Sequence, residues 1–391
     1  MTDDRVRVLH LLPHVAGGGA TLLAMELAAR LDPQRYAVKL AVGPSDSGEG
    51  SLLPQMRARG LDVLIVPNMR REPHARADLR ATLEIARILQ RERPHIVHSH
   101  GSKSRLLAPL ATGLCPTPVN VAHIWGWEWQ VAADAVRGAL YTTAAYLSVQ
   151  GHQALIACSD AMRDQGLLRG VGHPGQYDVV RPSVDLERFS PEGREQDRHE
   201  VRAEFNLPPD TPLIGSAMRL APQKAPEVLL GAAALLSALM PRVHWLIAGG
   251  GPREATVRQM VRRLDLTDRV ILAGPRSDIP RLLRACDLFA LSSAWEPFGV
   301  AYLEAGAVGL PVVGTRVDGS SEAVVHGTTG LLVEPGNPAL LATAIVRVLS
   351  DRPLSQRLGE AGMQRAKLFD HERFVGGVER VYERLLRTRD L

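Results

Sequence analysis

Short apolar runs that end at glycine, proline or polar residues alternate along the chain with segments in which apolar residues have helical spacing. In the first half this pattern predicts buried strands at 5–12, 36–42, 62–66, 95–98, 119–124, 154–157 and 177–181. It also predicts helices at about 21–31 and 78–90. Strands that alternate with helices indicate a parallel sheet covered on both faces.

A second series of the same kind begins near residue 213. Its predicted strands are 213–218, 244–249, 270–274, 288–292 and 311–315, and a closing helix is expected at about 371–388. The polar segment 188–200 lacks an apolar stripe at its start, so we interpret it as an interdomain linker that runs into a short helix. The predicted fold is therefore α/β, with two doubly wound, Rossmann-like domains facing across a cleft. Their limits are 1–190 and 191–370, followed by a C-terminal helix at 371–391.

The composition is that of an ordinary globular protein. Its 391 residues suffice for two domains, and 45% of them are hydrophobic. Basic residues exceed acidic ones by only 46 to 42, too small an excess to argue for nucleic acid, and no nucleic-acid partner is expected. Cys115, Cys158 and Cys286 are scattered and mostly in apolar contexts, so we expect buried thiols in a reducing cytoplasm rather than a disulfide or metal site.

We expect neither a signal peptide nor a membrane-spanning helix. The first residues place acids before a short apolar run, which predicts a strand. No run reaches the roughly 18–20 apolar residues that a spanning helix needs. Any membrane contact would therefore be peripheral.

The stretch E-P-F-G-V-A-Y-L-E, from Glu296 to Glu304, carries the most specific chemistry. A predicted strand precedes it and helical spacing follows it, so Glu296 is expected in a strand-end loop and Glu304 one or two turns into a helix. The N–H groups of Phe298, Gly299 and Val300 would lie at the helix N-terminus, where an anion is favoured. One carboxylate for sugar hydroxyls, free amides for a phosphate and a second carboxylate for a ribose indicate a sugar-nucleotide site.

This segment resembles the E-x7-E motif of the large retaining glycosyltransferases of family 4, which have the two-domain GT-B fold. Segments of matching kind occur in matching order at 218–224, 246–252, 304–315, 318–322 and 326–337. The resemblance is strong over roughly residues 211–390 and looser over 1–190. It implies an acceptor-side first domain, a second domain that binds the nucleotide sugar, a last helix that crosses back onto the first domain, and no metal or other cofactor.

The family's site residues carry over to matching positions. By resemblance, Glu304 binds the ribose hydroxyls and Glu296 the hydroxyls of the donor sugar. Arg219 and Lys224 would hold the diphosphate, for which a guanidinium fork and an ammonium are suited. A solvated loop pair is the alternative for these two basic residues.

Two positions depart from the family pattern. Ala225 and Pro226 follow Lys224, where the family usually has glycine, so the turn is expected to be stiffer. Asp318 stands where the family most often has the first of two glycines, which puts the shape of the loop near the donor sugar in question.

Two glycine loops follow predicted strands. Gly17 to Gly19 could bring backbone amides against the diphosphate, although any tight turn after a strand may use glycine. The loop lacks G-x-G-x-x-G spacing and no acid ends the second strand, so a nicotinamide site is not indicated. For Gly249 to Gly251, packing and donor binding are equal alternatives. The donor-binding candidates are Gly17, Gly18, Gly249, Gly251, Phe298, Gly299, Val300 and Glu304.

Histidines end two predicted strands of the first domain. By resemblance, His123 faces the transferred sugar, whereas a core histidine is the plainer interpretation. His98 and His100 flank Ser99, but no further ligand set is spaced for a metal, so structural or substrate-lining roles are favoured. The catalytic candidates are Arg219, Lys224, Glu296 and His123.

Two further features of the first domain have alternative interpretations. Trp125, Trp127 and Trp129 could stack on an acceptor sugar or pack in the core. The segment 51–93 carries nine arginines near Leu52, Leu53 and Met56, and such a surface would suit an anionic membrane or a lipid-diphosphate acceptor. Interleaved acids favour a solvated helix face instead.

Together these features predict a retaining glycosyltransferase that moves a sugar from a nucleoside diphosphate sugar to an acceptor hydroxyl. Family frequency favours a sugar or lipid-linked acceptor in cell-surface polysaccharide or glycolipid biosynthesis, with a cytoplasmic enzyme that is soluble or peripheral at the inner face of the membrane. Two alternatives remain open, namely a GT-B epimerase or phosphorylase, and a catalytically degenerate protein that binds a sugar nucleotide.

Overall fold

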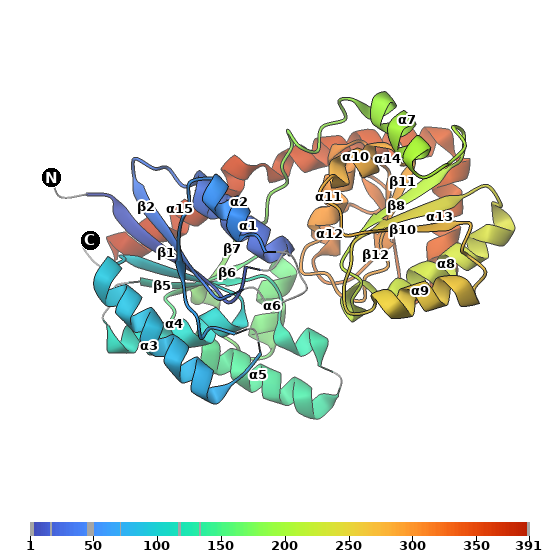
Figure 1. Ribbon diagram of the computed structural model, residues 1–391. Helices are drawn as coiled ribbons and strands as arrows, with labels where there is room; N and C mark the ends of the chain where they lie inside the picture. Colours follow the sequence, from blue (N-terminus) through green and yellow to red (C-terminus); the bar gives the residue numbers. More distant parts are fainter. Residues whose placement is uncertain are drawn as a thin grey trace. The chain divides into compact units, whose positions relative to one another are not determined.

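The computed structural model describes residues 4–15, 18–44, 51–70, 72–115, 119–132 and 134–388. The chain divides into two compact units. The first comprises Met1–Ser183 together with His371–Leu391, and the second comprises Val184–Asp370 (Figure 1). The division after residue 183 lies before the predicted limit at 190, and the C-terminal helix belongs to the first unit.

The first unit is built on a parallel sheet of seven strands in the order β3-β2-β1-β4-β5-β6-β7. These strands are β1 Val6–Leu12, β2 Tyr36–Val42, β3 Asp62–Ile65, β4 Ile96–His100, β5 Val119–Ile124, β6 Ala154–Ala157 and β7 Tyr177–Val179. All seven were predicted from the apolar pattern, and no end differs from the predicted one by more than two residues. Strands β2 and β3 lie on one side of β1 and the later strands on the other, which is the doubly wound arrangement.

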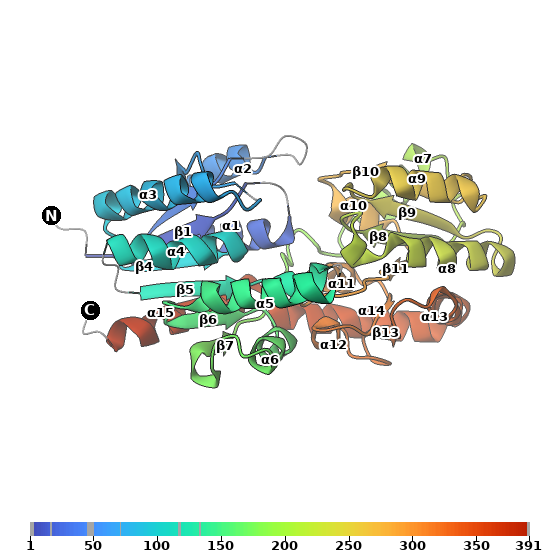
Figure 2. The same cartoon turned by 90° about the horizontal axis from the view of Figure 1, so that it is seen from below.

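Helices cover both faces of this sheet. They are α1 Gly19–Arg30, α2 Leu53–Ala58, α3 Ala75–Glu92, α4 Ser102–Leu114, α5 Ala135–Val149, α6 Asp160–Leu168 and α15 His371–Arg387, with short 3₁₀ helices at Glu128–Val131 and Pro174–Gln176. In β1, Val8 packs in a cluster with residues of α1 and α15, whereas Leu9 and Leu11 pack with α3 and α4. Figures 1 and 2 show α3, α4 and α5 side by side on one face of the sheet.

The second unit has a parallel sheet of six strands in the order β10-β9-β8-β11-β12-β13. Its strands are β8 Leu213–Ala217, β9 His244–Ala248, β10 Val270–Gly274, β11 Leu288–Ala290, β12 Val312–Thr315 and β13 Gly330–Val333. The apolar pattern predicted the first five and missed β13, which has only four residues and begins at a glycine. Its α-helices are α7 Arg194–Glu204, α8 Pro226–Leu239, α9 Glu254–Arg263, α10 Ile279–Arg284, α11 Val300–Ala307, α12 Ser320–Ala323, α13 Pro338–Ser350 and α14 Arg352–Ala366. Short 3₁₀ helices lie at Pro222–Lys224 and Lys367–Phe369.

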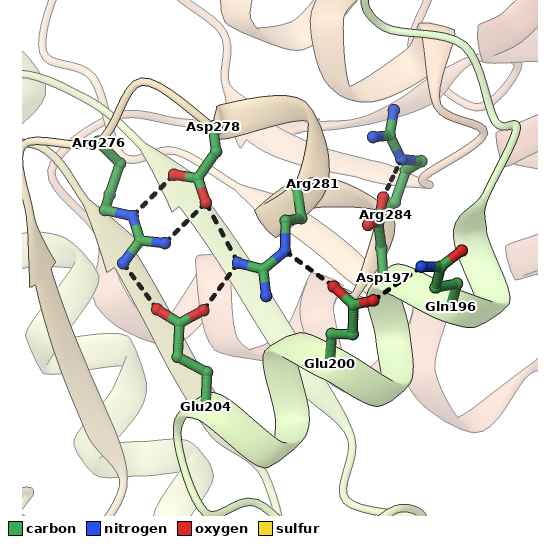
Figure 3. A network of polar contacts seen from close by, with 8 residues as sticks. All are labelled: Gln196, Asp197, Glu200, Glu204, Arg276, Asp278, Arg281 and Arg284. Atoms are coloured by element: carbon green, nitrogen blue, oxygen red, sulfur yellow. Dashed lines mark hydrogen bonds and ion pairs between the residues drawn. The ribbon is translucent and has the colours of Figure 1, made fainter.

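The segment predicted as an interdomain linker is mostly helix α7, docked on α10 of the same unit. Figure 3 shows an ionic network between them, in which Arg276 binds both Asp278 and Glu204 at 2.7 Å. Arg281 also binds Glu204 at 2.7 Å, and Arg284 pairs with Asp197. Arg276 holds the pKa of Asp278 at about 2, against an ordinary value near 4. The short helix expected after the linker is therefore present. Charge pairs anchor it to the second unit, and sequence spacing does not reveal such contacts.

Other sequence expectations concern thiols and membrane spans. Cys115, Cys158 and Cys286 are buried and form no disulfide with one another. Among the residues that the structure describes, no helix combines the length and the apolar character needed to span a bilayer.

Candidate functional site

Lys224 and Glu296 form an ion pair in the second unit. Lys224 ends the 3₁₀ helix after β8, and Glu296 lies in the loop after β11, the strand paired with β8. The carboxyl ends of parallel strands meet at one edge of a sheet, which brings the two loops together. The Ser293 hydroxyl donates to the Glu296 carboxylate at 3.0 Å, and the side chains of the pair are only 15% and 8% exposed. This is a largely desolvated charged pair between two predicted catalytic residues.

Hydrogen bonds fix the backbone around this pair. The Ser292 hydroxyl contacts the carbonyl oxygens of both Lys224 and Ala225 at 2.9 Å, and the Ala294 N–H donates to the Gln223 carbonyl at 2.8 Å. Ala225 has φ = 42°, in the left-handed region that favours glycine. Glycine, which the family usually has at this position, would suit this backbone, and here an alanine adopts it.

Asp318, the other departure from the family pattern, binds the loop that carries Glu296. The Glu296 N–H donates to the Asp318 carboxylate at 3.0 Å, and the Gly319 N–H donates to the Glu296 carbonyl at 3.0 Å. Asp318 has φ = 36°. A Cβ at residue 319 would lie 2.1 Å from the Pro297 carbonyl oxygen, so this glycine is required for the close approach.

The E-P-F-G segment leads into α11 through Gly299, whose backbone is in the left-handed region. Gly299 has φ = 102°, and a Cβ there would lie 2.6 Å from the ring of Tyr302. Phe298 is buried and packs edge-on against Phe369, with ring centroids 5.4 Å apart. The N–H groups of Phe298, Gly299 and Val300 donate to no other residue in the described part of the chain. Three amides at a helix N-terminus form a place where an anionic group is stabilised.

Glu304 lies in the second turn of α11, as predicted from the spacing. Burial raises the pKa of its carboxyl to about 7, and the charges of Arg188 and Lys224 oppose this shift. A carboxyl with this pKa can be ionised by a small stabilising interaction, such as hydrogen bonds from hydroxyl groups. Arg188 was assigned to the linker from the sequence, and its charge acting on Glu304 could be found only from the structure.

Arg219 is exposed on the loop between β8 and the 3₁₀ helix that ends at Lys224. Gly249 and Gly251, on the loop after β9, pack against this segment. A Cβ at residue 249 would lie 1.9 Å from the Met218 carbonyl oxygen, and one at residue 251 would lie 2.6 Å from that of Leu220. Both glycines have positive φ. Packing therefore accounts for both glycines, whereas their contact with a donor stays a prediction.

The glycine loop of the first unit is only partly described. Gly17 lies outside the described residues. Gly18 is exposed, caps the N-terminus of α1 in an extended conformation, and has no atom within 4 Å of an added Cβ. Neither backbone strain nor packing requires glycine at residue 18. A small residue at the N-terminus of a twelve-residue helix leaves the backbone open to an approaching group.

His123, at the carboxyl end of β5, has a fully buried ring. The ring stacks on Trp125 with centroids 3.7 Å apart, and neither nitrogen has a hydrogen-bond partner among the described residues. Burial lowers the pKa of His123 to about 3, so its imidazole is neutral at pH 7. The structure thus gives His123 a core environment, and its predicted contact with the sugar stays a prediction.

His98 and His100 lie beside a third histidine that sequence spacing did not reveal. His10 on β1 is the register partner of His98 on β4, and their side chains point to the same face. His10 Nδ1 and His100 Nε2 are 2.9 Å apart, and His98 Nδ1 lies 2.6 Å from the hydroxyl of Tyr382 on α15. One nitrogen of each of the three histidines lies within 4.8 Å of the others, so these residues could hold a metal ion. The expectation that H-S-H has no third ligand nearby was wrong, because a neighbouring strand supplies it.

The tryptophan cluster has mainly a packing role. Trp127 and Trp129 are buried and stack with centroids 4.6 Å apart. The Trp127 indole donates to the Met162 carbonyl at 2.7 Å, and the guanidinium of Arg169 lies over the ring of Trp129. Trp125 is partly exposed and donates to His100 at 3.3 Å. Core packing is therefore the correct interpretation for Trp127 and Trp129.

Two parallel, doubly wound α/β units are the architecture of the GT-B fold, and GT-B glycosyltransferases are the structural neighbours of this chain. The crystal structure of Anabaena HepE in complex with UDP and glucose superimposes with a TM-score of 0.83. It is 22% identical, and the match covers 97% of this chain and 100% of that one.

Within this class, the chain belongs to the glycosyl transferases group 1 family. The model of that family matches residues 197–365, and that of the glycosyl transferase 4-like domain matches residues 18–183. The D-inositol 3-phosphate glycosyltransferase of Mycolicibacterium smegmatis is 30% identical over 388 residues, with 94% of this chain and 87% of that protein covered.

The name of a second relative includes a lipid-linked acceptor. The UDP-Gal:alpha-D-GlcNAc-diphosphoundecaprenol alpha-1,3-galactosyltransferase of Escherichia coli is 25% identical over 357 residues, with 90% of each chain covered. Several other D-inositol 3-phosphate glycosyltransferases align over only about half of their length, as does that of Salinispora arenicola, at 50%, whereas that of Stackebrandtia nassauensis aligns over 83%.

Proposed function

We propose that this protein is a retaining glycosyltransferase that moves a sugar from a nucleoside diphosphate sugar to an acceptor hydroxyl. The observation that carries this proposal is the Lys224–Glu296 pair, which lies beside the loop leading to the free amides at the N-terminus of α11. A cation, anion-binding amides and two carboxylates gather at the strand ends of one unit. Membership of a glycosyltransferase family supports the same conclusion.

Each group has a proposed part in donor binding. Lys224 and Arg219 bind the diphosphate, together with the N–H groups of Phe298 to Val300. Glu296, once released from Lys224, accepts hydrogen bonds from the hydroxyls of the donor sugar. Glu304 accepts those of the ribose, and two such bonds favour its ionised form.

The proposed reaction needs no protein nucleophile. The acceptor oxygen bonds to the anomeric carbon on the face from which the diphosphate leaves, and a phosphate oxygen takes the acceptor's proton. The negative charge grows on the departing diphosphate, where Lys224, Arg219 and the amides stabilise it. Catalysis then consists of positioning plus electrostatic stabilisation, and we expect it to need no metal or other cofactor.

Relatives suggest the substrates. The Anabaena protein was crystallised with UDP and glucose, and the Escherichia coli relative is named for a UDP-linked donor and a diphosphoundecaprenol acceptor. We therefore propose a UDP-sugar donor and a sugar or lipid-linked acceptor in glycan or glycolipid biosynthesis.

The first experiment is a thermal-shift screen against UDP, GDP, ADP and their common sugar conjugates. A ligand that binds only the native state raises the melting temperature according to its affinity. We expect a shift with UDP that is lost in Arg219→Ala. No shift with any nucleotide would contradict the proposed donor site and favour a degenerate protein.

A turnover experiment separates the remaining alternatives. We expect release of UDP from a UDP-sugar to depend on an added acceptor, and NMR of the product to show the anomeric configuration of the donor. An altered sugar nucleotide formed without acceptor would indicate an epimerase. An inverted product would contradict the retaining mechanism.

A further inference from the structure

The outer face of α4 and α5 in the first unit is unusually apolar. On α4, Leu106, Leu110 and Leu114 are 37%, 55% and 58% exposed. On α5, Val136, Leu140 and Leu147 are 80%, 64% and 56% exposed. The two helices contact each other on one face of the sheet (Figure 2). Their exposed side, with these six side chains, is here called the α4–α5 face.

The exposed leucines of α4 lie along one side of the helix. Its three exposed leucines are four residues apart and so share one side of the helix, while Leu107, Ala108 and Ala111 fill the core on the other side. A surface helix normally places charged or polar residues opposite its core stripe. An apolar outer side is the pattern of a helix that is covered by something apolar.

The α4–α5 face carries little net charge. Neither α4 nor α5 contains an acidic residue. The two cations of α4 are buried and paired, Lys103 with Asp78 and Arg105 with Glu128. On α5, Arg137 is exposed beside Asp134, the residue that caps the helix. The α4–α5 face therefore offers aliphatic side chains with no uncompensated negative charge.

The neighbouring helix α3 adds exposed arginines. Arg76, Arg80 and Arg87 are exposed along α3, together with Leu79 and Leu83. The acids of α3 already have partners, which are Lys103 for Asp78, Asn68 for Glu84 and Lys39 for Glu92. Among the described residues, none of these three guanidinium groups pairs with an acid. Aliphatic side chains flanked by such groups match a bilayer surface with anionic headgroups.

We propose that the α4–α5 face rests on an anionic lipid bilayer, with its leucines among the acyl chains and the α3 arginines at the headgroups. Leu52, Leu53 and Met56, which the sequence suggested for this role, do not serve it, because Leu52 and Met56 are buried and Leu53 packs against their cluster. This inference deepens the proposed function, since a transferase acting on a lipid-linked acceptor must work at a membrane. Binding to vesicles requires no sugar transfer, so a failure of either proposal can be recognised separately.

Vesicle co-sedimentation of the full chain tests the proposal. Vesicles of phosphatidylcholine with about one third phosphatidylglycerol would be compared with vesicles of pure phosphatidylcholine. We expect binding to the anionic vesicles that weakens with salt, because headgroup attraction is screened. Leu110→Gln combined with Leu140→Gln should weaken binding at least about tenfold, since it removes two aliphatic groups from the acyl region.

A matched control lies in the second unit. Leu235 and Leu239 on α8 are 43% and 66% exposed, so Leu235→Gln with Leu239→Gln removes similar side chains elsewhere. We expect this control to bind vesicles as the wild type does, and both variants to keep the wild-type melting temperature.

Several outcomes would overturn the proposal. One is a wild-type protein that does not bind anionic vesicles, and another is a Leu110/Leu140 variant that binds them equally well. A third is a dimer, seen by light scattering, that this variant abolishes while vesicle binding persists. That result would assign the α4–α5 face to a second copy of the chain.

Discussion

Lys224 and Glu296 neutralise each other across two strand ends of the second unit. In the proposed donor complex they bind different parts of the donor, the diphosphate and the sugar. Each satisfies the charge of the other in a largely buried position. Donor binding as proposed must exchange this ion pair for contacts with phosphate and sugar. The ion pair therefore stabilises the fold without ligand, and it must break when the donor binds.

Lys224→Met should impair activity and stability together. Loss of one group that stabilises the leaving charge should lower turnover by about 10²–10³-fold. The remaining Glu296 would be a mostly buried, unpaired carboxylate, and the free energy of unfolding should fall by about 2 kcal/mol at pH 7. Urea unfolding and acceptor-dependent UDP release measure the two effects.

A second variant and a control sharpen this prediction. Adding Glu296→Gln to Lys224→Met should restore part of the stability but none of the activity, because no buried charge is left unpaired. Arg258→Ala removes an exposed ion pair with Glu254 in the same unit and should change stability by less than about 1 kcal/mol. Wild-type turnover in Lys224→Met would refute its assigned role.

Glu304 should make stability depend on pH without ligand. Its folded pKa of about 7 is above the ordinary value of 4.5, so the folded state binds the extra proton between these values. Stability should therefore fall as pH rises from 4.5 to 7, by up to about 1.4 kcal/mol per pH unit. Glu304→Gln should melt at a higher temperature than the wild type at pH 8, measured by differential scanning calorimetry. If the difference in melting temperature between variant and wild type were the same at pH 5 and pH 8, the raised pKa of Glu304 would be contradicted.

The same carboxyl should couple donor binding to pH. If ribose hydroxyls bind the ionised form, UDP binding should release a proton below pH 7, and affinity should fall as pH decreases from 8 to 6. Titration calorimetry in two buffers of different ionisation enthalpy counts the protons released. Glu304→Gln should bind UDP more weakly and release none.

Ala225→Gly should stabilise the protein. A left-handed backbone costs an L-residue roughly 1–2 kcal/mol, and glycine removes most of that strain while gaining unfolded-state entropy. We expect a net gain of about 0.5–1 kcal/mol in the free energy of unfolding. Ala361→Gly, in the middle of helix α14, should lose about 1 kcal/mol in the same urea titration. A loss at both positions would show that φ at residue 225 is not strained.

The buried histidines should make the first unit sensitive to acid. Burial lowers the pKa values of His10 and His123 to about 3 and those of His98 and His100 well below their ordinary value of 6.5. The unfolded chain then binds more protons below pH 6.5, so stability falls as pH decreases, by about 1.4 kcal/mol per histidine per unit.

A single substitution tests this linkage. His10→Gln should reduce the slope of stability against pH between 5 and 6.5 by about 1.4 kcal/mol per unit. His199→Gln, at an exposed position on α7, should leave the slope unchanged. Equal slopes in wild type and His10→Gln would show that His10 takes up its proton in the folded state.

Local patterns revealed strands better than they revealed contacts. The apolar runs gave β2, β5 and β6 with their observed limits, because buried parallel strands are continuously apolar. The docking of helix α7 was not predicted, since distant charges on α10 and on the residues just before it hold the helix. His10 was not singled out, because only the register of β1 with β4 places it beside His98.

The sequence predicted the elements that carry the candidate site residues, but not the contacts between those residues. Spacing placed Glu296 in a loop and Glu304 on a helix, and both placements are confirmed. The Lys224–Glu296 pair joins residues 72 positions apart, a distance over which no sequence period extends. The roles of these residues toward a donor remain predictions.

Helix α15 gives the first unit an unusual order of assembly. Its residues Phe374, Val378 and Tyr382 belong to the core of that unit, and Tyr382 binds His98 in the middle of the sheet. The ribosome makes this helix only after all of Val184–Asp370, so the nascent first unit lacks part of its core while the second can already fold. The unit that is synthesised first is thus completed after the second, and its histidine-lined face lacks the packing of α15 until that helix has been made.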